Sequence, residues 1–173
     1  FHKAGIIKKG IPVVIGPLEE EAENVLLTEA LGLQSPLWKL NVDFSLSKGT
    51  YESRDGTQIT NLAVPLPGSH QLDNAALAIR AVLYVLEQLH IEMNKDFVRN
   101  GLSKAFIPNR FEKITDTLYF DGAHNPASAR ALVNTVKEKF PNTPVHFYVG
   151  MIKGKDAETI LRIFEEISSN FTF

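Results

Sequence analysis

The stretch from Leu118 to Pro126, with the sequence Leu-Tyr-Phe-Asp-Gly-Ala-His-Asn-Pro, predicts a short apolar strand, a tight polar turn and the start of a helix. Asn125 is a suitable N-cap, and Pro126 suits the first helical position because its missing N–H needs no partner there. Apolar side chains then recur at three- and four-residue spacing. Asp121 is therefore expected at the carboxyl end of a strand, where ligands bind in open α/β sheets.

The C-terminal part of the chain alternates between strand and helix patterns. The expected order is strand 118–120, helix 126–139, strand 145–149, helix 156–168 and the beginning of another strand at 171–173. Such alternation predicts parallel βαβ units.

The N-terminal part begins in the same way but contains one region of a different kind. We expect a strand at 11–15, a helix at 19–31, a strand at 37–46, and helices at 70–89 and 95–104. Residues 48–66 alternate β-type side chains with the turn pairs Lys48-Gly49 and Asp55-Gly56, which predicts a small antiparallel patch. The fold class is therefore α/β, with a mainly parallel sheet. Residues 106–109 resemble a linker, which predicts domains at 1–108 and 109–173.

Composition excludes several classes of function. The chain has no cysteine, so disulfides and thiol chemistry are excluded. Its net charge of −2 gives no reason to expect nucleic acid or an anionic membrane as partner. No apolar run approaches the ~20 residues of a membrane span. We expect a cytoplasmic monomer, and the abrupt start at Phe1 predicts a piece of a longer protein.

The segment from Gly150 to Asp156 resembles a phosphate-binding P-loop without matching it. It is one residue short between the glycines, and Asp156 stands where a Ser or Thr would hold Mg²⁺. We therefore reject a P-loop here and expect Asp156 to be a helix N-cap.

The turn at Asp121 and His124 is the best functional candidate. A free carboxylate at a strand end commonly binds a ribose hydroxyl. His124 lies where the helix dipole disfavours the protonated ring, so it could serve as a neutral donor to an anion. The alternative is a capped strand-to-helix turn with an incidental histidine.

Three further segments carry candidate residues, each with a plainer alternative. His70 and Asn74 share a face of the helix expected at 70–89, and an amide can bind an adenine edge through one donor and one acceptor; the alternative is an ordinary polar first turn. Arg110 has the fork geometry that suits a phosphate, or it forms a salt bridge to Glu112 or Asp116. Lys3 lies in a short basic turn and is otherwise expected to be solvated.

Taken in order, these segments resemble the folylpolyglutamate synthase/dihydrofolate synthase family of the Mur ligase superfamily. The matching strings are Lys-Ala-Gly-Ile-Ile-Lys at 3–8, Gly-Ser-His-Gln-Leu-Asp-Asn-Ala at 68–75, Pro-Asn-Arg-Phe-Glu at 108–112 and Asp-Gly-Ala-His-Asn-Pro at 121–126. The family usually has Gly where this chain has Asn109, and Asn tolerates a positive φ better than most residues. A left-handed turn is therefore expected to survive there.

The resemblance implies a function and a set of roles. Residues 1–108 would be the latter part of the central ATPase domain, and 109–173 the first part of a Rossmann-like C-terminal domain. ATP would phosphorylate the carboxylate of folate or dihydropteroate, and the amine of L-glutamate would then form the amide. The resemblance implies three nucleotide contacts: Asn74, in the His70–Asn74 segment, would bind adenine, Arg110 the phosphates and Asp121 the ribose. It also implies that His124 lies near the reacting groups and that a carbamylated Lys3 positions Mg²⁺.

Mg²⁺ is the implied metal ion, with K⁺ as a second candidate, and the family P-loop would lie upstream of Phe1. We therefore expect these residues alone to be inactive. Two alternatives stay open: another Mur-type ligase that adds an amino acid to a peptidoglycan precursor, and a non-catalytic nucleotide-binding module.

Overall fold

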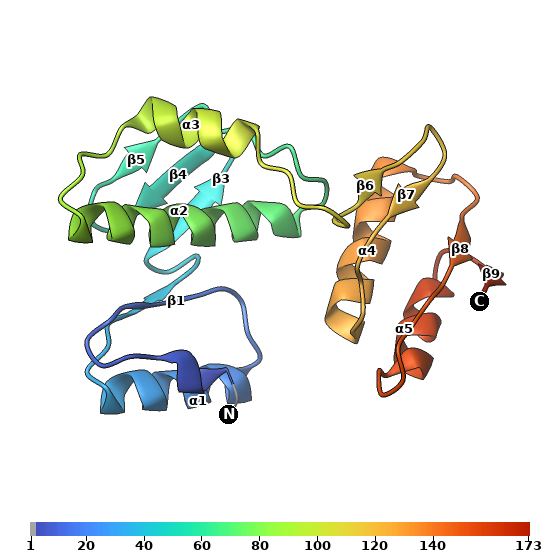
Figure 1. Cartoon of the computed structure of the whole chain (residues 1–173), viewed down its shortest axis with the longest axis horizontal. Helices are drawn as coiled ribbons and strands as arrows, with labels where there is room; N and C mark the ends of the chain where they lie inside the picture. Colours follow the sequence, from blue (N-terminus) through green and yellow to red (C-terminus); the bar gives the residue numbers. More distant parts are fainter. Residues whose placement is uncertain (1–2) are drawn as a thin grey trace. The chain divides into compact units, whose positions relative to one another are not determined.

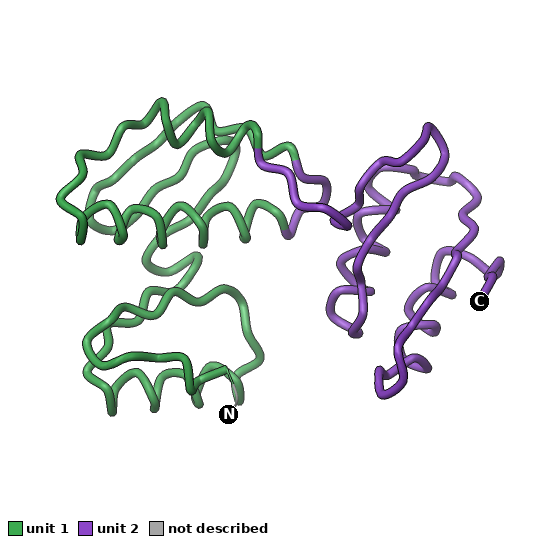
Figure 2. Tube along the Cα trace, in the orientation of Figure 1, with its two compact units in different colours: residues 1–65, 71–104 green, residues 66–70, 105–173 purple. Residues whose placement is uncertain are grey.

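The computed structural model describes residues 3–173, which form two compact units. Unit 1 comprises the residues up to 65 together with 71–104, and unit 2 comprises 66–70 together with 105–173 (Figure 2). No helix of the described residues is both long enough and apolar enough to cross a membrane.

Unit 1 begins with a strand–helix–strand motif. A short 3-10 turn, η1 (Ala4–Ile6), precedes β1 (Val13–Ile15), α1 (Glu20–Gly32) and β2 (Leu37–Lys39). The strands β1 and β2 pair in parallel, with Val13 opposite Leu37. Acidic residues occupy the first turn of α1, where the helix dipole favours negative charge. The strand–helix–strand order that the sequence predicts here is confirmed, and the structure shows that it is a parallel βαβ unit.

The antiparallel patch is also confirmed, as a three-stranded sheet of β3 (Phe44–Ser47), β4 (Thr50–Ser53) and β5 (Gln58–Ile59). Lys48 and Gly49 both have positive φ between β3 and β4, and Asp55-Gly56 lies in the next turn. The single strand expected at 37–46 is wrong, because the chain turns between β2 and β3. The Asp43 carboxylate stabilises that turn by accepting the backbone N–H of Lys39 at 2.8 Å.

Two helices complete unit 1: α2 (His70–Gln88) and α3 (Lys95–Ser103) lie beside the antiparallel sheet (Figure 1). The alanine-rich face of α2 allows close approach, so Ala75, Ala76 and Ile79 pack with the fully buried Tyr51 and Ile59. This cluster is the core of unit 1.

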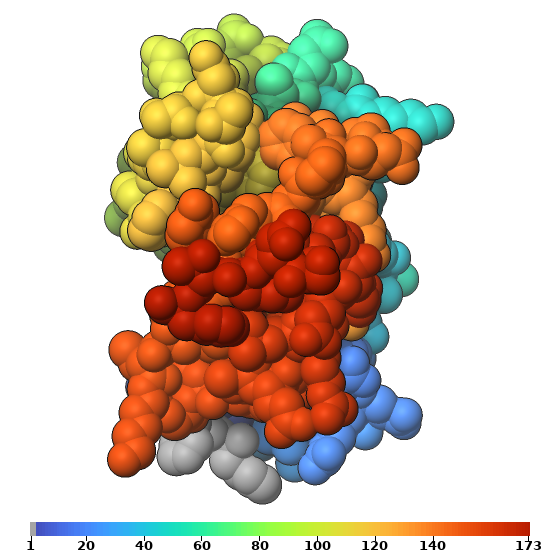
Figure 3. All heavy atoms as spheres, turned by 90° about the vertical axis from the view of Figure 1, so that its right-hand side faces the viewer, coloured from blue at the N-terminus to red at the C-terminus, as the bar shows by residue number. Residues whose placement is uncertain are grey.

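Unit 2 contains β6 (Glu112–Lys113), β7 (Tyr119–Phe120), α4 (Pro126–Lys139), β8 (His146–Tyr148), α5 (Ala157–Phe164) and β9 (Asn170–Thr172). The motif β8–α5–β9 is a second parallel βαβ unit, as the register of Phe147 opposite Phe171 shows. Its core lies between α4 and α5 and includes Val133, Ile160 and Phe164. The end of the chain lies at the surface (Figure 3), where Phe173 is exposed.

A mainly parallel sheet is not what the described residues form. They contain four small sheets, of which β1–β2 and β8–β9 are parallel and the other two antiparallel. The strand before α4 was expected to pair in parallel, but β7 pairs antiparallel with β6, with Glu112 opposite Phe120. The reason is local: the chain reverses between these strands, and the Thr115 hydroxyl accepts the N–H of Leu118 at 3.1 Å.

Candidate functional site

The turn between β7 and α4 has the capped geometry that the sequence predicts. The Asn125 side chain accepts the N–H of Ser128 at 2.9 Å, and the Ser128 hydroxyl accepts the N–H of Asn125 at 3.1 Å. This reciprocal capping box places Pro126 in the first turn of α4. The backbone from β7 into the helix is therefore fixed by its own residues.

Asp121 stabilises this turn through both of its carboxylate oxygens. Oδ1 accepts the N–H of Ala123 at 2.8 Å, and Oδ2 accepts the N–H of Phe111, also at 2.8 Å. The carboxylate is half-buried and has a structural task that the sequence did not reveal. Each oxygen retains a further lone pair, because an ionised carboxylate offers about four acceptor positions.

Arg110 lies in a tight left-handed turn beside Asp121. The residues on either side of it have positive φ: 58° at Asn109 and 48° at Phe111. The left-handed conformation expected at Asn109 is confirmed. The N–H of Asn109 donates to Glu112 Oε2 at 2.9 Å, and the Asn109 carbonyl accepts the N–H of Gly122 at 2.8 Å.

The guanidinium group of Arg110 is exposed and lies against Gly122. A Cβ atom added to Gly122 would be 3.0 Å from Arg110 Nη1. The salt-bridge alternative is wrong, since Arg110 makes no ion pair with any residue in 3–173. Glu112 instead accepts the N–H of Asn109, and Asp116 pairs with Lys113 at 2.8 Å. Arg110 is thus a positive charge available to a ligand.

His124 lies at the surface of the same turn. Its Nδ1 is 2.9 Å from the Gly122 carbonyl oxygen, and its backbone N–H donates to the Ser128 hydroxyl at 3.0 Å. Because a carbonyl oxygen only accepts, this contact requires the proton on Nδ1, which makes Nε2 of the neutral ring an acceptor. The expected neutral donor to an anion does not fit this geometry; only the protonated ring could donate from Nε2.

The other predicted residues belong to different surroundings. His70 is half-buried and lies close to Gly68, which has a φ of 100°. A Cβ atom added to Gly68 would overlap both the His70 ring and the Thr135 hydroxyl. Asn74 is exposed, and its Nδ2 donates to Gln71 Oε1 at 3.0 Å. Lys3 is exposed and precedes η1 without capping it. By contacts, Asn74 and Lys3 belong to unit 1, whereas His70, Arg110, Asp121 and His124 belong to unit 2.

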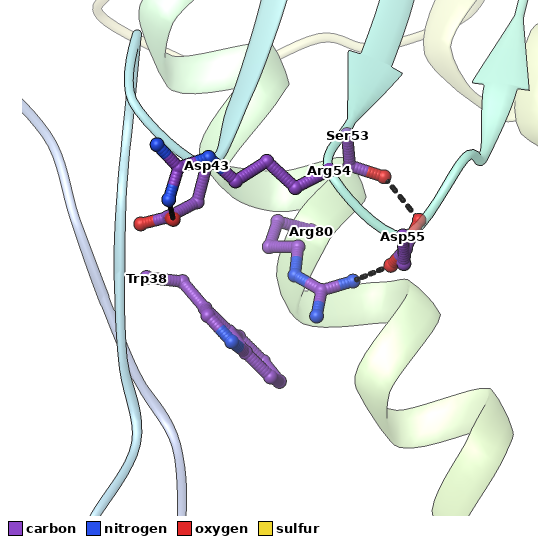
Figure 4. Close-up of a pocket in the computed structure, with 6 residues that line it drawn as sticks. All are labelled: Trp38, Asp43, Ser53, Arg54, Asp55 and Arg80. Carbon is purple, nitrogen blue, oxygen red and sulfur yellow. Dashed lines mark hydrogen bonds and ion pairs between the residues drawn. The ribbon is translucent and has the colours of Figure 1, made fainter.

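Sequence reasoning missed a polar pocket in unit 1 beside Trp38 (Figure 4). The Arg80 guanidinium lies 3.7 Å from the centroid of the Trp38 ring and forms an ion pair of 3.0 Å with Asp55. Hydrogen bonding from the Ser53 hydroxyl, above all, lowers the pKa of Asp55 to about 2, although partial burial opposes the shift. Arg54 pairs with Asp43 at 3.0 Å. Each charged group that lines this pocket is thus neutralised by a neighbour.

Comparison with known proteins shows which family the chain is similar to. Residues 106–171 match the family model described as dihydrofolate synthetase, C-terminal domain. The chain is 37% identical to the folylpolyglutamate synthase of Lacticaseibacillus casei, over 90% of this chain and 38% of that protein. It is 29% identical to the dihydrofolate synthase/folylpolyglutamate synthase of Bacillus subtilis (strain 168), over 99% of this chain and 42% of that protein.

A solved complex of FPGS with AMPPCP and folate superimposes with a TM-score of 0.89 and 34% identity, covering 98% of this chain and 43% of that one. The chain belongs to the folylpolyglutamate synthase/dihydrofolate synthase family. It spans about two fifths of the length of these family members.

The described residues of this family member do not by themselves fit a divalent metal ion. No group of three His, Asp or Glu side chains in residues 3–173 is placed to hold one. Lys3 as a lysine has three donors and no acceptor, so only a modified side chain could be a ligand. Mg²⁺ and K⁺ therefore stay predictions.

Proposed function

We propose that this chain is part of an ATP-dependent ligase that adds L-glutamate to folate. Its residues 1–108 would be the latter part of the ATPase domain, and 109–173 the first part of the C-terminal domain. Support comes from membership of a family whose named relatives are folylpolyglutamate and dihydrofolate synthases, and from a homologous structure that binds AMPPCP and folate. Dihydropteroate is a second proposed acceptor, since the family includes bifunctional names.

The proposed reaction has two steps. A folate carboxylate oxygen attacks the γ-phosphorus of ATP, which forms an acyl phosphate and releases ADP. The amine of glutamate then attacks the acyl carbon, and inorganic phosphate leaves as the amide forms. Because negative charge is spread over phosphate oxygens in the first step, a positioned cation beside them lowers the barrier.

The observation that carries the proposal is the exposed guanidinium of Arg110, which has no ion pair among the described residues. A guanidinium group presents a planar fork of donors that matches two phosphate oxygens. We assign Arg110 to the nucleotide phosphates. Asn74 remains the proposed adenine contact, and Asp121 has free lone pairs for a ribose hydroxyl in addition to its two backbone bonds.

His124 and Lys3 have less defined proposed roles. His124 lies beside Arg110 in the chain's fold, because both contact Gly122, and we place it near the reacting phosphate or the glutamate. With Nδ1 donating to the backbone, its free Nε2 would accept a proton or, once protonated, bind an anion. A carbamylated Lys3 would supply oxygen donors, and mass spectrometry of the intact protein would detect the added carbon dioxide.

The decisive experiment measures ADP formation by the complete gene product that contains these residues. We expect turnover to require folate, or dihydropteroate, together with glutamate. The substitution Arg110→Ala should reduce kcat/KM for ATP by roughly 10²–10³-fold, the usual range for losing one group that stabilises transition-state charge. Arg54→Ala, which removes an exposed arginine already paired with Asp43, should leave the rate unchanged.

Other outcomes separate the alternatives. Stimulation by a nucleotide-linked muramyl acid, but not by folate or dihydropteroate, would indicate a peptidoglycan ligase. Binding of AMPPCP without any turnover would indicate a non-catalytic module. We expect the 173 residues alone to be inactive, and folate-dependent ADP release from them alone would contradict that expectation.

A further inference from the structure

The backbone around Arg110 adopts a conformation that is unfavourable without support. Positive φ is tolerated by Asn109 but is uncommon for an aromatic residue such as Phe111, whose φ is 48°. Residues held in such regions persist only where the surroundings impose them, and they concentrate at ligand sites. The point at which the Arg110 side chain leaves the backbone is therefore set by whatever holds its two neighbours.

Three hydrogen bonds hold those neighbours: two involve Asp121 and Gly122, which follow β7, and one is local, to Glu112. Asp121 Oδ2 accepts the N–H of Phe111 at 2.8 Å. The Gly122 N–H donates to the Asn109 carbonyl at 2.8 Å, and Glu112 Oε2 accepts the Asn109 N–H at 2.9 Å.

Ring packing adds to these bonds, because the Phe111 ring stacks on Tyr119 with centroids 5.0 Å apart. The second oxygen of Asp121 meanwhile holds Ala123, so one carboxylate ties the arginine turn to the turn that precedes α4.

Gly122 has a separate effect on the guanidinium group. Its ideal Cβ position is 3.0 Å from Arg110 Nη1 and 3.4 Å from the Asn109 carbonyl oxygen. Gly122 does not have a positive φ, so an alanine there would not strain the backbone. A side chain at this position would instead displace the flexible end of Arg110, because that atom yields more easily than backbone.

From these contacts we infer that Asp121 and Gly122 are positioning residues for Arg110: Asp121 fixes the turn that carries it, and the missing side chain of Gly122 admits its guanidinium group. The ligand that this placement serves is the polyphosphate of the bound nucleotide, so the inference rests on the proposed function. It gives Asp121 a second role besides ribose binding, one that acts through Arg110.

The test uses the complete gene product and titrates AMPPCP by calorimetry. We expect Gly122→Ala to weaken AMPPCP binding about threefold and Gly122→Val about tenfold, because small displacements of a positioned group reduce binding and rate steeply. The thermal unfolding midpoint should stay at its wild-type value for Gly122→Ala. Gly150→Ala is the matched control, since Gly150 also lacks a positive φ and has no atom within 4 Å of its Cβ position.

A double-mutant cycle separates positioning from a general structural effect. In an Arg110→Ala background, Gly122→Val should have no further effect on AMPPCP binding. An equal loss in both backgrounds would overturn the inference, because Gly122 would then act on something other than Arg110. Asp121→Asn keeps one acceptor oxygen, so it should lose less affinity for AMPPCP than Asp121→Ala. Equal losses would overturn the role of the two Asp121 oxygens in holding Phe111 and Ala123.

Failure of the inference and failure of the proposed function give different results. If Arg110→Ala weakens AMPPCP binding but Gly122→Val matches wild type, the positioning inference is wrong and the proposed function stands. If Arg110→Ala itself leaves AMPPCP binding unchanged, the proposed phosphate contact is wrong.

Discussion

Two arginines of this chain, Arg80 and Arg110, have opposite surroundings. The Arg80 side chain is only 12% exposed, covers the Trp38 ring and pairs with Asp55. Arg110 is exposed, lies against a glycine and makes no ion pair within residues 3–173. The backbone differs too: Arg80 lies inside the regular helix α2, whereas Arg110 lies between two residues of positive φ.

The comparison separates a stabilising arginine from one available to a ligand. A charge that is stacked and paired has its interactions satisfied inside the protein, and removing it leaves its partner without a counter-charge. A charge that is exposed and unpaired, on a turn held by its neighbours, adds little to folding and has its interactions free for an anion. The pocket beside Trp38 is therefore assigned to stability, and the turn at Arg110 to binding.

The largest expected effect is on folding stability. Arg80→Ala should lower the free energy of unfolding by about 3 kcal/mol, because it removes a nearly buried charge partner, a cation–π contact and the packing of the aliphatic stem. Arg110→Ala should change it by no more than about 0.5 kcal/mol, as is usual for exposed positions. Urea denaturation of both variants measures the difference. Similar losses for the two would refute the distinction between them.

A smaller effect is expected from pH, through Asp55. Its pKa in the folded protein is about 2, below the ordinary 3.8. A lowered pKa means that the ionised form stabilises the fold fully above pH 4, and that this stabilisation disappears as the pH falls through about 2. Because 46% of the Asp55 side chain is exposed, water screens the interaction and the contribution at neutral pH should be about 1 kcal/mol.

Asp55→Asn provides the measurement. Its unfolding free energy should lie below that of the wild type at pH 7, and the two should converge towards pH 2. Asp116→Asn is the control, since Asp116 is almost fully exposed in its pair with Lys113. A wild-type advantage that persists unchanged at pH 2 would mean that the charge of Asp55 is not the cause.

What the sequence could predict depends on how far apart the interacting residues lie. The helix start at Asn125–Pro126, the N-cap at Asp156 and the hairpin at Asp55-Gly56 are encoded within a few residues, and all are confirmed. The pairing of β6 with β7 was missed, because two-residue strands carry no periodic signal.

The same limit applies to the sites. The stacking of Arg80 on Trp38 joins residues of α2 and β2, and the hydrogen bond from Phe111 to Asp121 joins residues on either side of a strand pair. No local sequence pattern predicts such contacts. Asp121 and His124 were identifiable from their place between a predicted strand and a predicted helix, and the family resemblance added a role for Arg110. The hydrogen bond from Phe111 to Asp121, which ties the arginine turn to that place, has no sequence signal.

The smallest expected effect tests how the Arg110 turn keeps its conformation. Asn109 has φ of 58°, which glycine adopts without a steric penalty, and its side chain makes no hydrogen bond among the described residues. Asn109→Gly should therefore change the unfolding free energy by no more than about 0.5 kcal/mol, since relief of strain and the greater freedom of the unfolded chain oppose each other.

AMPPCP affinity should stay at its wild-type value as well, because the bonds to Glu112 and Gly122 use backbone atoms that glycine retains. Asn142→Gly, at φ of 62° in the turn that follows α4, is the control for the backbone effect alone. A loss of affinity in Asn109→Gly without a matching loss of stability would show that the Asn109 side chain itself restricts Arg110. The placement of Arg110 would then depend on three neighbours, Asn109, Asp121 and Gly122, and the contrast with Arg80 would sharpen further.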